Sequence, residues 1–420
     1  MANLISPETA SALRARIDLE TSGPDPKIPG LVYCAVNRDG DIIFSHASGT
    51  TALGGKTPMS LDTTFWLASF TKTATGIACM QLVEQGRLAL DDHDLIEKLA
   101  PELRDVQVLE EQPNGSITLV PKKTPITLKM LLTHTSGFGY TFSVPKLRDW
   151  SRPTGLDDFS GIRSDTLNRP LVHQPGTTFE YGTGVDWAGV LVERVTGQSL
   201  EDYFQEHIFQ RLGIQTISFR PTNDVKARLA TMHHRDPSGK LHIRDHLYRA
   251  PLVEEDPDKL FCMGGAGCFG APIEYCNNAT AFDENLYSDL IATLLNDGTH
   301  PKTGAQLLKP ETVELMFTDQ IPEHPRHLNE FWESAKPDLT NQGPIMTYEG
   351  DPTEGWGLSF SLSHQPTSTG RPAGSAWWEG LANLFWFADR KTGVGCVIAS
   401  QILPYGGKLH TSVEANESRY

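Results

Sequence analysis

The chain has 420 residues, enough for two or three folding units, and its 39% hydrophobic and 21% charged residues are typical of a globular protein. The formal net charge of −16 disfavours nucleic acids and anionic membrane surfaces as partners, because their phosphates and this surface repel each other. We expect two lobes, although interleaved domains can resemble a single one.

The cysteines and the N-terminal residues indicate the cellular compartment in which the protein is expected. No two of the 6 cysteines form a C-x-x-C pair, so neither a zinc site nor a disulfide framework is indicated, and we expect them to be reduced and buried. The N-terminus has no basic region followed by an apolar stretch, and no segment approaches the roughly 18 apolar residues of a membrane span. We therefore expect a cytoplasmic protein.

The first fifty residues predict a helix followed by a β-hairpin. Residues 6–20 open with an N-capping serine, a proline and an acid, and continue with leucine and isoleucine among charges. Residues 31–36 and 42–46 are β-type runs on either side of an Asn-Arg-Asp-Gly turn signal.

The middle third of the chain is predicted to be mainly helical. Apolar residues recur at helical spacing from about 73 to 86, which places a buried helix directly after Ser69 and Lys72. Further helices are expected over 184–196 and 200–212, the first ending at a Thr-Gly stop.

Strands return near the C-terminus. Residues 354–362, 384–388 and 394–400 are aromatic and β-branched runs separated by turn residues. Residues 320–352 carry five prolines and little periodicity, so we expect a long irregular segment and a candidate wall of the functional site.

These elements predict an α+β fold of two lobes, with an antiparallel sheet flanked by helices and a mainly helical lobe. Residues 1–72 and 271–420 would form the discontinuous sheet domain, and residues 73–270 the helical domain.

The pair Ser69 and Lys72 is a candidate catalytic unit. A serine hydroxyl is a weak nucleophile until a base removes its proton, and residues at i and i+3 share one face of a helix. A lysine acts as a base only if its pKa is lowered, and an apolar environment does this. The neighbouring residues are apolar: Leu67, Ala68, Phe70 and Ile77.

The alternative is an ordinary serine and lysine on an exposed helix, since S-x-x-K arises by chance in many chains. The surrounding run of residues 65–76, Phe-Trp-Leu-Ala-Ser-Phe-Thr-Lys-Thr-Ala-Thr-Gly, is more apolar than an exposed face would be. This context favours the catalytic interpretation.

Several ordered blocks make the sequence similar to the serine β-lactamase, penicillin-binding and esterase superfamily, and to its class C β-lactamase-like branch in particular. The resemblance covers most of the chain and implies a two-lobe β-lactamase-like fold. Its blocks are Ser69-Phe-Thr-Lys72, the LLTHTSG block ending at Gly137, residues 175–181 leading into 189–197, residues 263–270, and Gly355-Trp-Gly-Leu358.

The resemblance implies that Tyr181 is the tyrosine of the family's Y-x-N motif, which with Lys72 moves the proton of Ser69 to the leaving group. Thr183 stands where the family has asparagine, which weakens any inference about how an amide-bearing substrate is held. A core tyrosine with a satisfied hydroxyl is the alternative for Tyr181. The sequence leaves open which of Lys72 and Tyr181 is the base.

Family members also have a strand that lines the site and donates a backbone N–H to the oxyanion, alongside the N–H of the nucleophile. Residues 391–393 spell the lactamase motif K-T-G, but they lie between two strand-like runs and are predicted to be a turn. Trp378-Glu379-Gly380, predicted to start the preceding strand, resembles the W-x-G that replaces K-T-G in esterases and acyltransferases. Leu381 would then supply the second oxyanion donor.

The remaining members of the expected substrate site are Phe70, Thr183, Trp378 and Glu379. Trp378, with Trp377 beside it, would offer a flat apolar wall to an acyl chain or polyketide. Without the K-T-G lysine there is no cation at that position for the carboxylate of a β-lactam, so antibiotic hydrolysis is disfavoured.

No metal or other cofactor is expected. The histidines at 233, 234, 242 and 246 could suggest a metal site, but their surroundings are predicted to be a hairpin with Pro-Ser-Gly at its turn, and no spacing of metal ligands is diagnostic. The resemblance implies a structural role for His134.

The sequence predicts a serine acyltransferase or esterase acting on a small polyketide-like metabolite. Residues 180–187 resemble the Y-G-x-G-x-D-W stretch of transesterases that acylate secondary metabolites, such as the enzyme that attaches the lovastatin side chain. The expected partners are an acyl thioester or ester, with an acyl carrier protein as one candidate donor, and an alcohol or water as acceptor. The alternatives are a hydrolase proper, such as a carboxylesterase, β-lactamase or D-peptidase, and a non-catalytic or repurposed member of the fold.

Overall fold

The two ends of the chain together build the largest sheet of the protein. The computed structural model describes residues 5–153, 155–276, 290–344, 350, 352–367 and 370–406. The strands of the eight-stranded sheet are, in spatial order, β2 (Ile42–Gly49), β1 (Gly30–Asn37), β14 (Val394–Ala399), β13 (Leu384–Asp389), β12 (Ala376–Gly380), β11 (Ser361–Ser363), β10 (Thr353–Trp356) and β9 (Arg326–His327).

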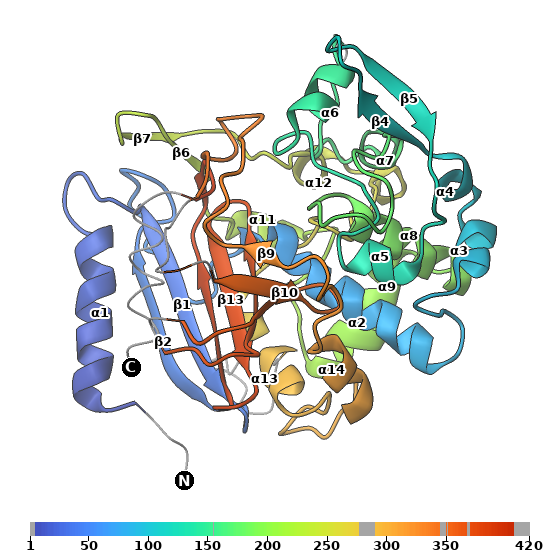
Figure 1. The fold of residues 1–420 in the computed structure, drawn as a ribbon. Helices are drawn as coiled ribbons and strands as arrows, with labels where there is room; N and C mark the ends of the chain where they lie inside the picture. Colours follow the sequence, from blue (N-terminus) through green and yellow to red (C-terminus); the bar gives the residue numbers. More distant parts are fainter. Residues whose placement is uncertain are drawn as a thin grey trace.

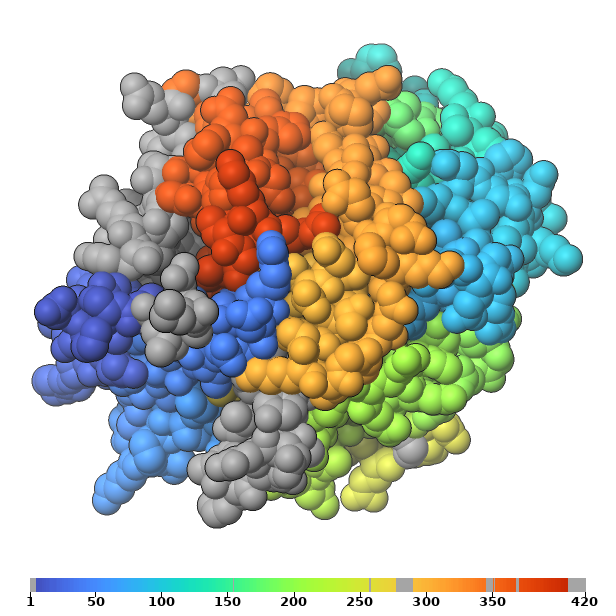
Figure 2. Space-filling view, turned by 90° about the horizontal axis from the view of Figure 1, so that it is seen from below, coloured from blue at the N-terminus to red at the C-terminus, as the bar shows by residue number. Residues whose placement is uncertain are grey.

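Every pairing in this sheet is antiparallel, which confirms the predicted sheet. The two chain ends join where β1 pairs β14, with Val32 opposite Ala399. Figure 2 shows the N-terminal segment in blue against the C-terminal strands in red on one face of the molecule.

Helices cover both faces of the sheet. Helix α1 (Pro7–Thr21) begins at the predicted cap, where the Ser6 hydroxyl accepts from the Thr9 N–H, and lies outside β1 and β2, whereas the other helices lie on the opposite side (Figure 1). Those helices are α2 (Thr71–Glu84), α3 (His93–Leu99), α4 (Pro101–Asp105), α5 (Leu128–Leu132), α6 (Pro145–Trp150), α7 (Arg163–Leu167), α8 (Gly184–Thr196), α9 (Leu200–Phe204), α10 (Gln210–Leu212), α11 (Asn223–Ala227), α12 (Ala250–Val253), α13 (Leu290–Leu295) and α14 (Pro310–Met316).

The middle third is mainly helical, as predicted, with short strands between the helices. The helix predicted over 200–212 is α9 and α10 joined by a π-helical turn. The smaller sheets pair β3 (Phe65–Trp66) with β8 (Phe269–Gly270), β4 (Gln107–Glu111) with β5 (Ile117–Pro121), and β6 (His233–Arg235) with β7 (Leu241–Ile243) and β15 (Ile402–Leu403).

One strand prediction is wrong. The run 354–362 is two strands, β10 and β11, which turn back on each other between Trp356 and Ser361. The turn forms at Gly357, where a Cβ would lie 2.1 Å from the Met316 carbonyl oxygen, and at Ser359, whose φ is 89°. Helix α14 is therefore packed against the turn so closely that only glycine fits.

A continuous hydrophobic core links the sheet to the helices and contains Val32 of β1, Trp386 of β13 and Leu191 of α8. The division into a domain of residues 1–72 with 271–420 and a domain of residues 73–270 stays a prediction. The hydrophobic core is continuous across both of these boundaries. None of the helices in the described part of the chain combines the length and apolar character that crossing a bilayer requires.

Candidate active site

Ser69 lies on a bend between the short strand β3 and helix α2. The bend is a 3₁₀ turn over Ala68–Phe70, and Ala68 has a φ of 47°, in the left-handed region that a residue with a Cβ seldom adopts. The strain is maintained because Leu67 and Phe70 on either side are fully buried. Ser69 itself remains 8% exposed and lines the cavity described below.

Lys72 lies one helical turn further on, fully buried, and its ammonium group has three oxygen neighbours. Nζ is 3.0 Å from Ser69 Oγ, 2.7 Å from the Gly265 carbonyl oxygen and 3.3 Å from the Tyr140 hydroxyl. Burial lowers the pKa of Lys72 from 10.5 to about 7, although the charge of Asp186 acts in the opposite direction. Near neutral pH a large share of Lys72 is therefore uncharged and able to accept a proton.

Tyr181 approaches Ser69 from the other side. Its hydroxyl donates to Ser69 Oγ at 2.7 Å and accepts from the Trp378 indole N–H at 3.1 Å. Burial raises the pKa of Tyr181, so the phenol stays protonated at neutral pH. The structure thus brings together all three residues predicted to be catalytic.

His134 supports the tyrosine. Its ring lies 4.6 Å from that of Tyr181, centroid to centroid, and Nδ1 accepts from the Gly182 N–H at 3.2 Å. Burial keeps the pKa of His134 well below its usual value, so the ring is neutral. These contacts agree with the structural role implied for His134.

Asp186 and Gly265 are parts of the site that the sequence did not identify. The Gly265 N–H donates to Asp186 Oδ1 at 2.9 Å, while the carbonyl oxygen of the same glycine accepts from Lys72. A Cβ at residue 265 would lie 2.4 Å from Asp186 Oδ2, so this close approach requires glycine. Asp186 is buried and burial raises its pKa, although the nearby Lys72 opposes this.

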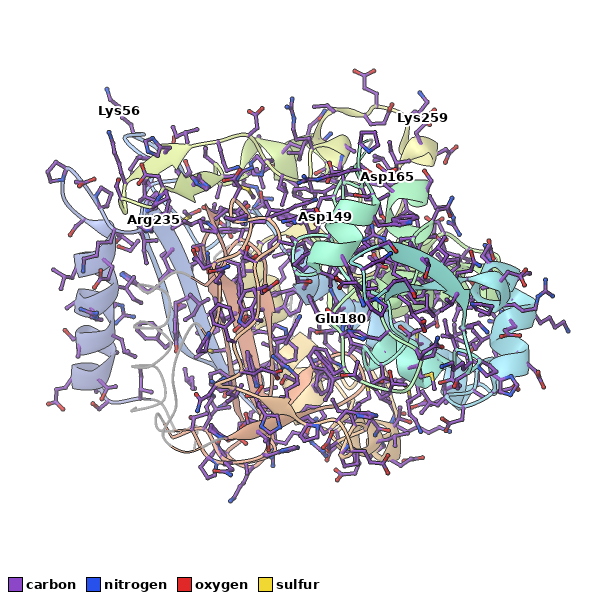
Figure 3. All side chains as sticks on the ribbon, turned by 45° about the horizontal axis from the view of Figure 1, so that its top comes forward. Lys56, Asp149, Asp165, Glu180, Arg235 and Lys259 are labelled. Carbon is purple, nitrogen blue, oxygen red and sulfur yellow. The ribbon has the colours of Figure 1, made fainter. Side chains whose placement is uncertain are left out.

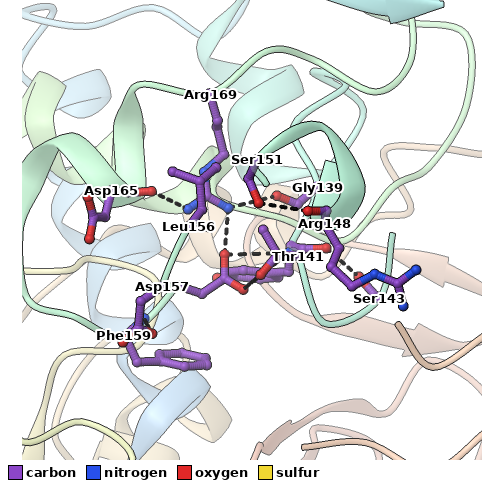
Figure 4. Close-up of polar contacts among 12 residues, drawn as sticks. Gly139, Thr141, Ser143, Arg148, Ser151, Leu156, Asp157, Phe159, Asp165 and Arg169 are labelled. Carbon is purple, nitrogen blue, oxygen red and sulfur yellow. Dashed lines mark hydrogen bonds and ion pairs between the residues drawn. The ribbon is translucent and has the colours of Figure 1, made fainter. Parts of the chain in front are cut away.

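A buried ion pair holds the loop that carries Tyr140 (Figure 4). Arg169 donates to Asp158 Oδ1 at 2.6 Å and to the Gly139 carbonyl oxygen at 3.3 Å. Asp158 also accepts from the Thr141 N–H at 3.1 Å and from its hydroxyl at 2.5 Å. Residues 139 to 141 are therefore fixed on both sides of Tyr140.

Ser69 opens into a cavity of about 550 Å³ whose wall is rich in aromatic side chains. Glu180, which precedes Tyr181, lines it and lies near the middle of the molecule, whereas Lys56 and Lys259 lie at the periphery (Figure 3). The aromatic lining residues are Tyr140, Phe142, Phe159, Phe179, Tyr181, Phe331, Trp332, Trp377, Trp378, Phe385 and Tyr405.

The predicted wall segment lines the cavity. Residues 324–328, 330–332 and 340 contribute to it, which confirms the expectation that 320–352 forms a wall of the site. Residues 345–349 and 351 of that segment lie outside the described residues. The β9 pairing explains the placement, because it attaches the start of the segment to the edge of the large sheet.

The W-x-G residues Trp378, Glu379 and Gly380 line the cavity, as does Leu381. They lie at the end of β12, not at the start of a strand as predicted, and Leu381 is the first residue beyond it. The end of β12 reaches the bend before Ser69, since a Cβ on Gly380 would lie 3.0 Å from the Leu67 carbonyl oxygen.

Two residues of the predicted substrate site lie elsewhere. Phe70 points into the core, where its ring packs on Tyr275 and its carbonyl oxygen accepts from the Tyr275 hydroxyl at 2.7 Å. Thr183 is fully buried at the start of α8. Neither is among the described residues that line the cavity.

The motif at 391–393 is a turn, as predicted. It connects β13 to β14, and the Asp389 carboxylate accepts from the backbone N–H groups of Lys391 at 2.9 Å and Thr392 at 3.1 Å. The histidines at 233, 234 and 242 lie on the β6–β7 hairpin, as predicted, whereas His246 lies beyond the end of β7. Within the described residues no group of histidine, cysteine and acidic side chains has the arrangement of a metal site.

Known proteins resemble the chain over nearly its whole length. The Beta-lactamase family model matches residues 14–411. Lovastatin esterase of Penicillium rubens is 33% identical over 411 residues, covering 91% of each chain. Monacolin J acid methylbutanoyltransferase of Aspergillus terreus is 32% identical over 391 residues, covering 90% of this chain and 88% of the relative. The solved structure of unliganded simvastatin synthase from Aspergillus terreus matches with a TM-score of 0.78 and 28% identity, over 99% of this chain and 98% of that one.

Proposed function

Because the chain belongs to the Beta-lactamase family, we propose that it is a serine acyltransferase or esterase that acts on a small polyketide-like metabolite through an acyl-enzyme on Ser69. The observation that carries this proposal is the position of Ser69 Oγ, within hydrogen-bond distance of both Lys72 and Tyr181. A largely buried serine that lines a cavity and contacts two proton-transfer groups has the arrangement of an activated nucleophile.

In the proposed mechanism, Ser69 Oγ attacks the acyl carbonyl carbon as its proton passes to Lys72. The pKa of about 7 suits Lys72 to this step, because a base whose pKa lies near the ambient pH is neutral often enough and still basic enough. Tyr181 keeps its proton and is placed to donate it to the departing oxygen or sulfur as the acyl–leaving group bond breaks.

The negative charge on the carbonyl oxygen needs donors fixed in advance. We assign this role to the backbone N–H groups of Ser69 and Leu381, since the end of β12 and the bend at Ser69 border the same cavity. An alcohol or water then attacks the acyl-enzyme, and its proton passes to the Tyr181 oxygen, which gave up its own proton in the first half-reaction. Lys72 returns the proton it received to Ser69 Oγ as the acyl–Ser69 bond breaks.

The cavity supports a bulky substrate with both apolar and polar parts. Its volume of about 550 Å³ lies within the usual range of small-molecule sites, and its wall combines many aromatic side chains with charged ones such as Glu379 and Arg326. The relatives' names point to the same class of substrate: one is a lovastatin esterase and another a monacolin J acid acyltransferase. We propose a soluble thioester, or one held by an acyl carrier protein, as donor.

The setting of the reaction is proposed to be the cytoplasm. The described residues include all six cysteines, each a buried thiol, which suits a reducing compartment.

Product analysis tests the proposal. Wild-type protein is incubated with butanoyl and 2-methylbutanoyl thioesters, with and without hydroxylated polyketide acceptors, and free acid and ester products are quantified by chromatography. An acyltransferase gives ester in proportion to the acceptor, an esterase gives free acid alone, and Ser69→Ala gives neither. Acid or ester formation that survives in Ser69→Ala would contradict the proposal.

A further inference from the structure

Asp186 is a buried acid that the proposed mechanism does not use. It lies in the first turn of α8 and is 1% exposed. Oδ1 accepts from the Gly265 N–H at 2.9 Å, whereas Oδ2 has no hydrogen-bond partner among the described residues. A buried carboxylate oxygen without a donor is costly. A residue needed only to hold the Gly265 N–H would require neither this second oxygen nor its charge.

Gly265 connects Asp186 to Lys72. Its N–H donates to the carboxylate, and its carbonyl oxygen accepts from Lys72 Nζ at 2.7 Å. A Cβ at residue 265 would lie 2.4 Å from Oδ2 and 3.0 Å from Oδ1, so only glycine lets the carboxylate approach this closely. Both Asp186 and Lys72 are buried, and a charge acts more strongly on its neighbour where water is excluded.

Several contacts favour the ionised form of Asp186. Burial raises the pKa of the carboxyl group, whereas the charge of Lys72, the Gly265 N–H and the charge of Arg169 lower it. The position in the first turn of α8 acts in the same direction, because the N-terminus of a helix favours negative charge.

The other titratable groups beside Lys72 are neutral near neutral pH. Burial raises the pKa of Tyr140 and that of Tyr181, so both phenols are protonated. Burial also lowers the pKa of His134, so its ring is uncharged. Among the described residues, Asp186 is the one whose charge raises the pKa of Lys72. An ammonium group on Lys72 therefore has this carboxylate as its counter-ion.

The counter-ion is needed when Ser69 attacks. The Ser69 O–H bond breaks and its proton moves to Lys72 Nζ, while Oγ bonds the acyl carbonyl carbon and the carbonyl oxygen takes up the negative charge. Lys72 thereby changes from a neutral amine into a buried ammonium, which is costly unless an opposite charge is near.

We infer that Asp186 is a positioning residue that acts through Gly265 as the counter-ion of this ammonium, so that the base of the reaction is the unit of Lys72, Gly265 and Asp186. This inference rests on the proposed function and assigns a further residue to the same site.

The variant Asp186→Asn tests the inference, because its amide oxygen can still accept from the Gly265 N–H and only the charge is removed. Acylation is followed as the burst of p-nitrophenolate from p-nitrophenyl butanoate, and kcat/KM for this ester is measured from about pH 5 to about pH 9. The acid limb of kcat/KM reports the ionisation of Lys72 in the free enzyme.

Two changes are expected together in Asp186→Asn. The acid limb should move down by about one pH unit or more, the shift that loss of an adjacent opposite charge produces. The plateau of kcat/KM above the limb and the burst rate should both fall about 10-fold, because a weaker base removes the Ser69 proton less readily.

Glu201→Gln is the matched control. Glu201 is also a buried carboxylate whose pKa is raised by burial, and it accepts from the Phe219 N–H at 2.7 Å. Its further hydrogen bonds are to Ser218 and Gln205, not to the catalytic residues. This variant should keep the wild-type limb and plateau.

A limb at the wild-type pH in Asp186→Asn would overturn the inference even if the rate falls, because a structural defect reduces the amount of active enzyme without moving the limb. A wild-type plateau would overturn it as well. Wild-type protein that shows neither burst nor turnover would overturn the proposed function, and the inference with it, so the two failures are distinguishable.

Discussion

Replacing Lys72 with an apolar residue should stabilise the protein while abolishing its activity. Folding moves the pKa of this lysine from 10.5 to about 7. The unfolded chain therefore binds one more proton than the folded chain between these pH values, so the lysine makes stability rise with pH across this window. Below pH 7 the destabilisation is fully present, and above pH 10.5 it is gone.

The size of the effect follows from the same shift. At 1.36 kcal/mol per pKa unit, Lys72 costs the folded state about 4 kcal/mol at pH 7 and about 2 kcal/mol at pH 9. Lys72→Met alone would leave Asp186 buried beside an apolar group, so the test uses the double variant Lys72→Met/Asp186→Asn.

Urea unfolding of wild type and the double variant at pH 7 and pH 9 measures the difference. The stability gain of the variant should be about 2 kcal/mol larger at pH 7 than at pH 9. Lost hydrogen bonds to Ser69, Tyr140 and the Gly265 carbonyl reduce the gain equally at both pH values, so the pH dependence is the diagnostic quantity. A gain that is the same at both pH values would refute the assignment of a strongly lowered pKa to Lys72.

Three further changes test individual parts of the site. Asp186→Asn removes the negative charge that raises the pKa of Lys72, so the acid limb of the kcat/KM profile should move to lower pH; an unchanged or higher limb would contradict the coupling. Trp378→Phe keeps an aromatic ring but removes the indole N–H that donates to the Tyr181 hydroxyl. It should lower kcat/KM for a neutral ester about 10-fold without changing the melting temperature. Full activity in this variant would show that the hydrogen bond is dispensable. Arg169→Met leaves the buried Asp158 without its ion-pair partner and should lower the free energy of unfolding by about 3–5 kcal/mol. Thermal and urea unfolding measure this loss. Arg148→Met, which breaks a surface ion pair, is the control and should not reproduce it.

The parts of the fold that could be predicted are those set by local pattern. Helices α2 and α8 follow from apolar spacing and their stop signals, and the sheet follows from β-type runs at both chain ends. The turn that splits 354–362 could not be read in this way, because it depends on the Met316 carbonyl oxygen approaching Gly357 from a helix distant in sequence.

The residues of the candidate site fall into the same two groups: those that a local sequence pattern predicts and those that only folding brings together. Ser69, Lys72 and Tyr181 belong to motifs with fixed spacing or a family resemblance, and all three meet at one oxygen atom. Asp186 and Gly265 are 79 residues apart and carry no joint motif, so their contact appears only once the chain is folded. Each lies in a segment that resembles the family, 180–187 and 263–270, but neither segment alone indicates that the two residues touch.

The contacts of Arg326 could not be predicted for a related reason. The sequence around it shows no periodicity, and the three aromatic rings near its guanidinium come from other parts of the chain. Phe70 and Thr183 illustrate the opposite error: adjacency to Ser69 and Tyr181 in the sequence suggested contact with substrate, but neighbouring residues on a bend or at a helix start point in different directions.

The most direct test of the account is intact-protein mass spectrometry after incubation with a panel of acyl thioesters and p-nitrophenyl esters. The account predicts a mass gain of one acyl group in wild-type protein, located on Ser69 by peptide mapping and absent from Ser69→Ala. Folded wild-type protein that gains no acyl group from any donor, or an acyl group that persists in Ser69→Ala, would contradict it.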